Sequence, residues 1–269
     1  MWATQTSIIA NTKIHYRRNP QNADKPPLVM LHGITDNGAC FMRVADALAD
    51  EFDPVMVDLP GHGASGAPSE GYTPESFADS VLGLVAALGL YRPVLIGHSM
   101  GAEIAALVAI DAPELIQGII MEDPPFRAQP LSDKKITAMC NWWENLIRER
   151  RAKKLDALVV EAQQRHWHDL DAQHWATSKR QVFPEIVAYI RTQNQHDWRH
   201  TLQQIACPTL VLTGDSVNQS AIITPEVAEE IAQLLPNSTI IHVPNASHSI
   251  RRDQFDLYLD AVRMFLKKL

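Results

Sequence analysis

Apolar segments of about five residues alternate along the chain with longer segments whose apolar residues recur at helical spacing. Short strands separated by helices are typical of βαβ units, which form a mostly parallel sheet. The N-terminal segment Thr6–Ala10 is expected to pair with the next strand as an edge hairpin. The other strands are predicted at Thr12–Tyr16, Leu28–His32, Pro54–Asp58, Pro93–Gly97, Gly118–Glu122, Thr209–Thr213 and Thr239–Val243.

Amphipathic segments between these strands predict helices. Two of them begin with threonine followed by proline, at Thr73-Pro74 and Thr224-Pro225. A threonine at the N-cap with proline at the first helical position is a typical helix start. The predicted helices are Ala39–Ala49, Pro74–Leu88, Met100–Asp111, Pro225–Leu235 and Gln254–Lys268.

One long stretch interrupts the alternation. From about Arg127 to His200 the sequence contains amphipathic helix patterns and no buried-strand segment. A length of 269 residues suits one large domain with an insertion. We therefore expect a core formed by 1–126 and 201–269, with 127–200 lying over the sheet as a helical subdomain.

Tryptophan is concentrated in this predicted subdomain, which contains five of the six tryptophans in the chain. Most of them are expected to form the core of the subdomain itself, and two or three to face a ligand cavity beneath it. Trp142, Trp143 and Trp167 are the candidates for substrate contacts. The basic run Arg148–Lys154 is expected to form a solvated helix face, with a specific anion site as the lesser alternative.

Composition and charge narrow the classes of partner. Lys and Arg total 24 against 31 Asp and Glu, and the net charge of −7 argues against nucleic-acid binding, which needs clustered positive charge. No apolar segment reaches the roughly 18 residues of a membrane-spanning helix, and no signal-peptide pattern is visible. Cys40, Cys140 and Cys207 are widely separated and form no CxxC pair. This cysteine usage favours a reducing compartment, so we expect a cytoplasmic protein.

The strongest local signal is the G-x-S-x-G pattern of Gly97–Gly101, which reads GHSMG. An apolar strand precedes it, and the helix-forming segment Ala102–Ile110 follows it. A sharp strand-to-helix turn strains the backbone of its middle residue, and glycines on either side relieve the crowding. Such a turn would hold the Ser99 hydroxyl at a helix N-terminus, where developing negative charge is stabilised. The alternative is a glycine-rich turn with an inert serine.

A strand that ends in His32-Gly33 supplies a second signal. An acyl-transfer site needs two preorganised donors for the oxyanion. We expect one backbone N–H from Met100, directly after the serine, and the other from Ile34 in the loop after the early strand. His32 itself is interpreted as a structural residue that holds this loop, rather than as a catalytic base.

Together these motifs resemble the α/β-hydrolase superfamily, and in particular serine hydrolases of the esterase and lactonase type with a helical cap. The resemblance covers nearly the whole chain, with Arg127–His200 in the place of the variable cap. It implies an eight-stranded, mostly parallel α/β-hydrolase sheet with helices on both faces, and a Ser-acid-His triad in that chain order. The matching pieces are the His32-Gly33 loop, the Asp58–Ser65 turn, the Gly97–Gly101 elbow, the strand Thr209–Thr213 and His248.

His248 is the candidate for the base of the triad. It lies just after the last predicted strand, and ligand crevices form at the carboxyl ends of parallel strands. His242 is a rival, but it lies within the strand pattern and is expected to be a packed side chain. We therefore expect His248 to act as general base and general acid.

Two aspartates compete for the role of the triad acid. The family commonly places the acid three residues beyond a glycine that ends the strand Thr209–Thr213, but that position is Val217 here. Asp215, one residue after the glycine, is one candidate. The other is Asp123, which follows the preceding strand 24 residues after Ser99 and matches the other acid position known in the superfamily. We favour Asp123, and strand alternation should point its neighbour Glu122 away from it.

These residues predict two-step hydrolysis of a small-molecule carboxylic ester or lactone through an acyl-enzyme. Carbon–carbon bond hydrolysis with the same triad is the alternative among enzymes, and a non-catalytic ligand receptor is the alternative outside them. No metal and no organic cofactor is expected, because no metal-ligand spacing, GxGxxG or Walker pattern is found. The expected partner is a small-molecule substrate, and neither nucleic acid nor membrane.

Overall fold

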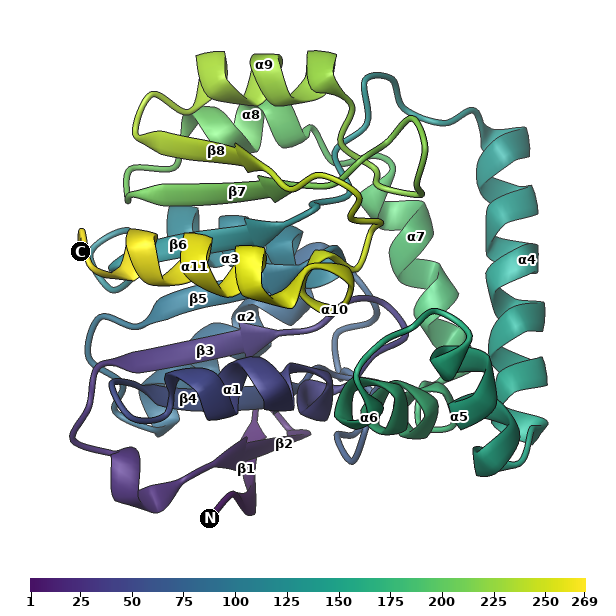
Figure 1. Ribbon diagram of the computed structural model, residues 1–269, viewed down its shortest axis with the longest axis horizontal. Helices are drawn as coiled ribbons and strands as arrows, with labels where there is room; N and C mark the ends of the chain where they lie inside the picture. Colours follow the sequence, from purple (N-terminus) through teal and green to yellow (C-terminus); the bar gives the residue numbers. More distant parts are fainter.

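The protein, described for residues 1–269 by a computed structural model, is built around one eight-stranded sheet (Figure 1). The strand order is β1-β2-β4-β3-β5-β6-β7-β8. β2 pairs antiparallel with β1 and β4, and all other neighbours are parallel, so the predicted sheet is confirmed. Each predicted strand overlaps one of the observed strands, which are β1 Ala3–Ile9, β2 Thr12–Arg18, β3 Pro27–Leu31, β4 Asp53–Asp58, β5 Val94–His98, β6 Gly118–Glu122, β7 Thr209–Thr213 and β8 Ser238–His242.

The helices of the core begin where the sequence predicts helix starts. The Thr73 side chain accepts a hydrogen bond from the N–H of Ser76, and the Thr224 side chain accepts one from the N–H of Val227. Proline follows each threonine and needs no N–H acceptor, so both predicted caps are confirmed. The core helices are α1 Met42–Leu48, α2 Pro74–Ala87, α3 Met100–Asp111, α9 Pro225–Leu234, α10 Ile250–Asp253 and α11 Phe255–Leu266.

Side-chain alternation along the central strands creates two hydrophobic layers. Leu28 and Met30 of β3 pack on one face of the sheet with α1 and α11. Val29 and Leu31 pack on the other face with α2 and α3. Figure 1 shows α1 and α11 in front of the sheet and α2 and α3 behind it. Because both faces are covered, the central strands are apolar at successive positions, as parallel strands usually are.

Two predicted helices start later than the sequence pattern suggested. The segment expected to be helical from Ala39 begins instead with a 3₁₀ turn, Gly38–Phe41, because the N–H of Gly38 is bound by Asp58 Oδ1 at 2.8 Å. The last predicted helix is preceded by the separate short helix α10. Gln254, between α10 and α11, is not helical, with φ −135° and ψ 60°, so it interrupts the helical periodicity.

Only helices and turns lie between β6 and β7. We call α4 to α7 the cap; they lie beyond the carboxyl ends of the strands in Figure 1, whereas α8 packs with α3 and α9. None of the helices in the structure combines the length and the apolar composition needed to cross a bilayer. The helices of this stretch are α4 Asp133–Ala152, α5 Leu155–Gln163, α6 Asp169–Lys179, α7 Val187–Gln193 and α8 Trp198–Gln203, with a 3₁₀ turn at Pro184–Ile186.

Candidate active site

Ser99 forms the turn between β5 and α3. Its backbone is in the left-handed region, with φ 52° and ψ −118°, a conformation that costs about 1–3 kcal/mol for a residue with a side chain. A Cβ on Gly97 would collide with the carbonyl of Gly101, and one on Gly101 would collide with the carbonyl of Leu31. The two glycines therefore allow the close approach of β3, β5 and α3 that holds Ser99 in this conformation.

His248 and Asp123 meet across the loops that follow β8 and β6. His248 Nδ1 lies 2.6 Å from Asp123 Oδ2. The Asp123 side chain is fully buried and also accepts hydrogen bonds from the N–H groups of Ile222 at 2.8 Å and Ile223 at 3.1 Å. An ionised carboxylate only accepts hydrogen bonds, so Nδ1 of His248 is the donor in this contact and Nε2 is the ring nitrogen left for other partners. Ser99 and His248 line the same cavity.

His98, directly before Ser99, contacts His248 in two ways. Its Nε2 donates to the carbonyl oxygen of His248 at 2.8 Å, and the two rings lie 4.7 Å apart. Burial, followed by the nearby Arg251 guanidinium, lowers the pKa of His98 well below its usual value, so the ring is neutral. His98 thus ties the loop of His248 to the serine turn. The G-x-S-x-G pattern leaves position 98 open, so the sequence does not predict this contact.

The other candidates for acid and base lie elsewhere. Asp215 accepts hydrogen bonds from the N–H groups of Val217 and Asn218 and so caps its own turn. Glu122 binds Arg251 instead, with 2.8 Å between Oε2 and Nη1. His242 was expected to be packed, and this is wrong: its side chain is exposed, because β8 is an edge strand.

Ile34 and Met100 border the cavity close to Ser99. The N–H of Ile34 has no acceptor within the protein, while its carbonyl lies 2.7 Å from Nε2 of His62. Met100 is the first residue of α3, where N–H groups have no acceptor within the helix. These are the two backbone donors that the sequence predicts for an oxyanion.

The loop that carries Ile34 is held by His32. Nε2 of His32 accepts a hydrogen bond from the N–H of Leu59 at 3.0 Å, and Nδ1 donates to the carbonyl of Gly33 at 2.8 Å. Burial lowers the pKa of His32 to about 3, so the ring stays neutral in this pattern. His32 therefore makes the loop contacts expected of a structural residue. The next residue, Gly33, packs against the serine turn. A Cβ added to Gly33 would lie 2.7 Å from Nδ1 of His98.

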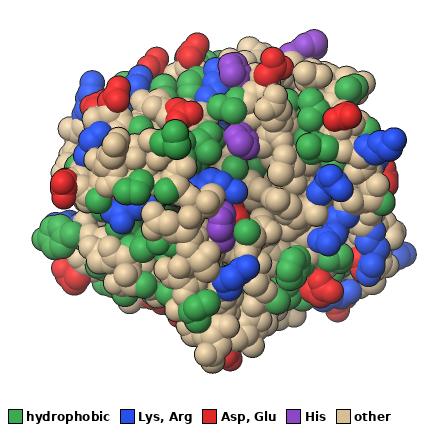
Figure 2. Space-filling view, turned by 90° about the horizontal axis from the view of Figure 1, so that it is seen from below, with side chains coloured by type: hydrophobic (Ala, Val, Ile, Leu, Met, Phe, Trp, Pro, Cys, Tyr) green, Lys and Arg blue, Asp and Glu red, His purple; other side chains and the backbone are tan.

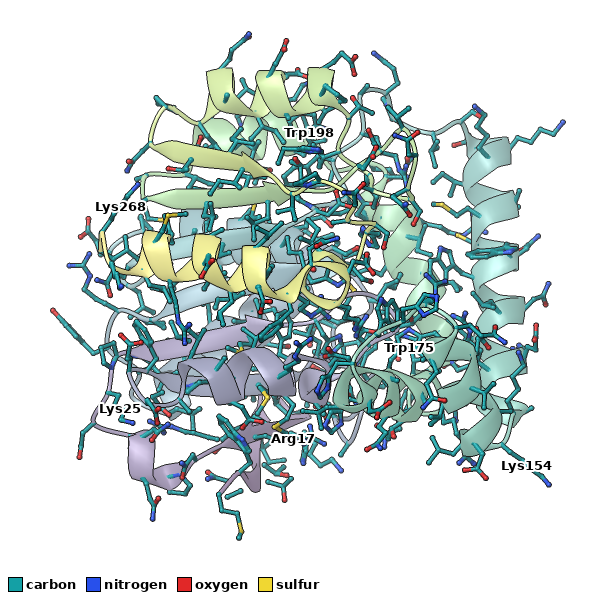
Figure 3. The ribbon with its side chains drawn as sticks, in the orientation of Figure 1. Arg17, Lys25, Lys154, Trp175, Trp198 and Lys268 are labelled. Carbon is teal, nitrogen blue, oxygen red and sulfur yellow. The ribbon has the colours of Figure 1, made fainter.

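A cavity of about 510 Å³ opens above Ser99 between the core and the cap. Four of its lining residues are tryptophans: Trp142, Trp143, Trp167 and Trp175. Trp198 does not line the cavity and stacks instead on Phe126, with 5.1 Å between the ring centres. Figure 3 shows Trp198 far from Trp175, which does line the cavity.

Trp167 also connects the cap to the loop that carries His248. Its Nε1 donates to Asp253 Oδ1 at 2.6 Å. The other oxygen of Asp253 accepts a hydrogen bond from the N–H of Ser247 at 2.8 Å. Since Ser247 directly precedes His248, this chain of contacts fixes the position of His248 relative to the cap. Trp142, by contrast, is 57% exposed at the rim.

A buried cluster of charges, which sequence analysis did not identify, lies beside the cavity. Asp36 binds Lys179 through Oδ1 at 2.6 Å and Arg252 through Oδ2 at 2.7 Å. Arg251 lies between Asp36 and Glu122, at 3.1 and 2.8 Å. Burial alone would raise the pKa of Asp36, but the three cations outweigh it and hold that pKa well below its usual value.

Arg150 is a further exception to the sequence prediction. The run Arg148–Lys154 was expected to be a solvated helix face, and this is wrong for Arg150, which lines the cavity and binds Glu161 at 2.7 Å. Its guanidinium lies 4.9 Å from the ring centre of Trp175. Arg148 does point outward, since its side chain is 63% exposed.

Glu103, in the first turn of α3, ties the serine helix to the segment that returns from the cap. Its carboxylate accepts a hydrogen bond from Tyr189 Oη at 2.7 Å and faces His196 Nδ1 at 3.0 Å. Burial raises the pKa of Glu103, and the hydrogen bond to Glu103 raises the pKa of His196. The structure contains no group of three histidine, cysteine or carboxylate side chains arranged to hold a metal ion.

Comparison with known proteins agrees with this architecture. The family model described as the alpha/beta hydrolase fold matches residues 26–251. The chain is 24% identical over 254 residues to 2-(acetamidomethylene)succinate hydrolase of Mesorhizobium japonicum, covering 90% of this chain and 88% of that protein. It is 26% identical over 241 residues to N-formylmaleamate deformylase of Pseudomonas putida, covering 89% and 88%. The structure of an esterase from Exiguobacterium antarcticum superposes with a TM-score of 0.80 at 19% identity, covering 98% and 100%.

The chain therefore belongs to the alpha/beta hydrolase fold family. The sheet, the G-x-S-x-G turn after β5 and the helices inserted after β6 are the features that place it there. Hydrolysis is the broad activity that goes with this family.

Proposed function

We propose that the protein is a serine hydrolase of small-molecule carboxylic esters or lactones, with Ser99 as nucleophile, His248 as general base and Asp123 as the triad acid. The observation that carries the proposal is the 2.6 Å contact between His248 Nδ1 and Asp123 Oδ2. It fixes the imidazole with its Nε2 lone pair available, in the cavity into which the strained Ser99 turn opens.

The reaction proceeds in two halves. His248 takes the proton of Ser99 while Oγ attacks the carbonyl carbon, and Asp123 stabilises the imidazolium that forms. His248 then gives this proton to the leaving alkoxide, and the acyl group remains on Oγ; in a lactone the new alcohol stays attached to the acyl chain. Water next loses a proton to His248 as it attacks the acyl carbon, and the carboxylic acid leaves as Ser99 recovers its proton.

The backbone N–H groups of Ile34 and Met100 hold the oxyanion in both halves. Met100 lies at the start of α3, where the helix dipole also favours negative charge. Loss of one such donor raises the barrier by about 3 kcal/mol in comparable sites. The contacts of His32 and His62 with this loop fix the donor of Ile34 before substrate binds.

The cavity suits a small molecule. Its volume of about 510 Å³ is within the range usual for small-molecule sites. Trp142, Trp143 and Trp167 supply apolar surface for the acyl or alcohol portion.

The proposal includes a cytoplasmic location and a separate cap. The three cysteines are unpaired, which supports the location. The helices α4 to α7 support the assignment of residues 127–200 to the cap.

The names of the relatives guide the choice of substrates. One structural relative is an esterase, and two sequence relatives are named for 2-(acetamidomethylene)succinate and N-formylmaleamate. A substrate panel should therefore contain short acyl esters, lactones and these two compounds. We expect the wild-type protein to hydrolyse the esters or lactones, and Ser99→Ala to reduce that turnover to near background. Turnover of the N-acyl compounds alone would reject the ester proposal, and undiminished turnover by Ser99→Ala would reject the role of Ser99.

A further inference from the structure

The cavity above Ser99 is strongly basic in an otherwise acidic protein. The whole chain has a net charge of −7, yet Asp36 is the one acidic residue among those that line the cavity. In Figure 2, several basic side chains (blue) lie close together on the right, the side on which the cap helices lie in Figure 1. The basic residues that line the cavity are Arg127, Arg150, Arg165, Lys179 and Arg252.

The buried charges beside the cavity do not balance. Three cations, Lys179, Arg251 and Arg252, share two carboxylates, Asp36 and Glu122. The side chains of the three cations are each 1–3% exposed, so solvent does not compensate the third positive charge. A buried charge without a partner destabilises the fold by several kcal/mol, so such an excess is unusual unless a ligand neutralises it.

Arg252 is the member of this cluster with unused hydrogen-bonding capacity. Its Nη2 binds Asp36, whereas its Nε has no partner. Arg252 lines the cavity and lies in the short helix α10, four residues after His248. It lies 5.1 Å from the ring centre of Trp167.

Arg165 brings a second cation to the same tryptophan. Its guanidinium lies 5.2 Å from the ring centre of Trp167, and its side chain has no hydrogen bond or ion pair within the protein. Arg150, in contrast, is already paired with Glu161. Arg165 and Arg252 are therefore the cations at the Trp167 end of the cavity that a ligand can engage.

We propose that the substrate carries a free carboxylate, separate from the bond that is cleaved, and that Arg252 and Arg165 bind this carboxylate at the Trp167 end of the cavity. One carboxylate neutralises the single excess charge of the buried cluster, and Arg165 supplies a second, unpaired guanidinium at the same tryptophan. Guanidinium groups bind carboxylates with short, charge-assisted hydrogen bonds. This inference rests on the proposed ester or lactone hydrolysis.

A matched pair of esters tests it. Monomethyl glutarate and methyl pentanoate have acyl chains of the same length, and only the first ends in a carboxylate. We expect kcat/KM for monomethyl glutarate to exceed that for methyl pentanoate at least tenfold, and this ratio to fall as ionic strength rises. Arg165→Gln and Arg252→Met should each reduce the ratio about tenfold. Arg252→Met leaves two cations with two carboxylates, so the charges of the buried cluster become balanced.

Arg148→Gln is the control variant, because it removes the same charge from an outward-facing side chain of α4. It should leave the ratio unchanged. Equal turnover of the two esters by the wild-type protein, or a ratio that neither variant changes, would overturn the carboxylate site while leaving ester hydrolysis intact.

A binding measurement separates the site from the chemistry. Calorimetry of glutarate with the Ser99→Ala protein should show binding that Arg252→Met weakens about tenfold. If neither ester is hydrolysed but glutarate binds in this way, the proposed function fails and the carboxylate site stands. If inorganic phosphate binds and glutarate does not, the carboxylate assignment is wrong.

Discussion

Nδ1 of His248 lies 2.6 Å from Oδ2 of Asp123, although 125 residues separate them in the sequence. The contact follows from the sheet, because β6 and β8 run parallel on either side of β7 and their carboxyl ends open at the same edge. Two backbone N–H groups, of Ile222 and Ile223, hold the carboxylate in place. The orientation of the imidazole is thus set by the fold rather than by the substrate.

The two aspartates that the sequence left in competition can be separated by matched substitutions. Asp123→Asn should lower kcat by up to about 10⁴-fold, because an amide at this position favours the wrong tautomer of His248. Asp215→Asn should change kcat less than threefold, since the Asp215 side chain bonds only within its own turn. Steady-state rates with the best ester of the panel are the measurement. A large loss confined to Asp215→Asn would contradict the assignment.

Gly33 should tolerate no side chain. The Cβ of Gly33→Ala would lie 2.7 Å from His98 Nδ1 and 3.4 Å from Ser99 Cβ, so it would displace the serine turn. A displacement near 1 Å can cost about 10²-fold in rate, and we expect a loss of that order in kcat. Gly66→Ala is the control, because its Cβ would meet Lys13 at ordinary contact distances of 3.6–3.7 Å. Full activity in Gly33→Ala would show that the loop is not packed as described.

The contact between His196 and Glu103 predicts a pH-dependent part of stability. The hydrogen bond to Glu103 raises the pKa of His196 above its usual 6.5, so the folded protein binds the proton more tightly than the unfolded chain. This contribution is complete below pH 6.5 and is lost as the pH rises through the raised pKa. The thermal midpoint of the wild type should exceed that of His196→Gln by more at pH 6 than at pH 8.5. A difference that grows with pH would contradict the sign.

The sheet was predictable because its strands are short, apolar and punctuated by glycine and proline. Leu28–His32 and Gly118–Glu122, for example, match observed strands to within one residue. The start of α1 was not predictable, since a contact distant in sequence, from Gly38 to Asp58, shapes its first turn. The exposure of His242 was missed because periodicity cannot distinguish an edge strand from a central one.

The candidate site was predictable where local sequence requires special geometry. The glycines around Ser99 are such a signal, and so is the position of His248 after the last strand. The cluster of Asp36, Lys179 and Arg252 gave no signal, because its members come from three distant segments and charged residues are usually exposed. Only the order of the strands and the docking of the cap bring these side chains together.

Covalent labelling of Ser99 tests the central claim most directly. A fluorophosphonate reacts with a serine only when a neighbouring base activates the hydroxyl, and mass spectrometry of the digested protein locates the adduct. We expect close to one label per chain, on the peptide that contains Ser99, and loss of labelling in both Ser99→Ala and His248→Ala. A wild-type protein that stays unlabelled while folded, or an adduct on a residue other than Ser99, would contradict the account.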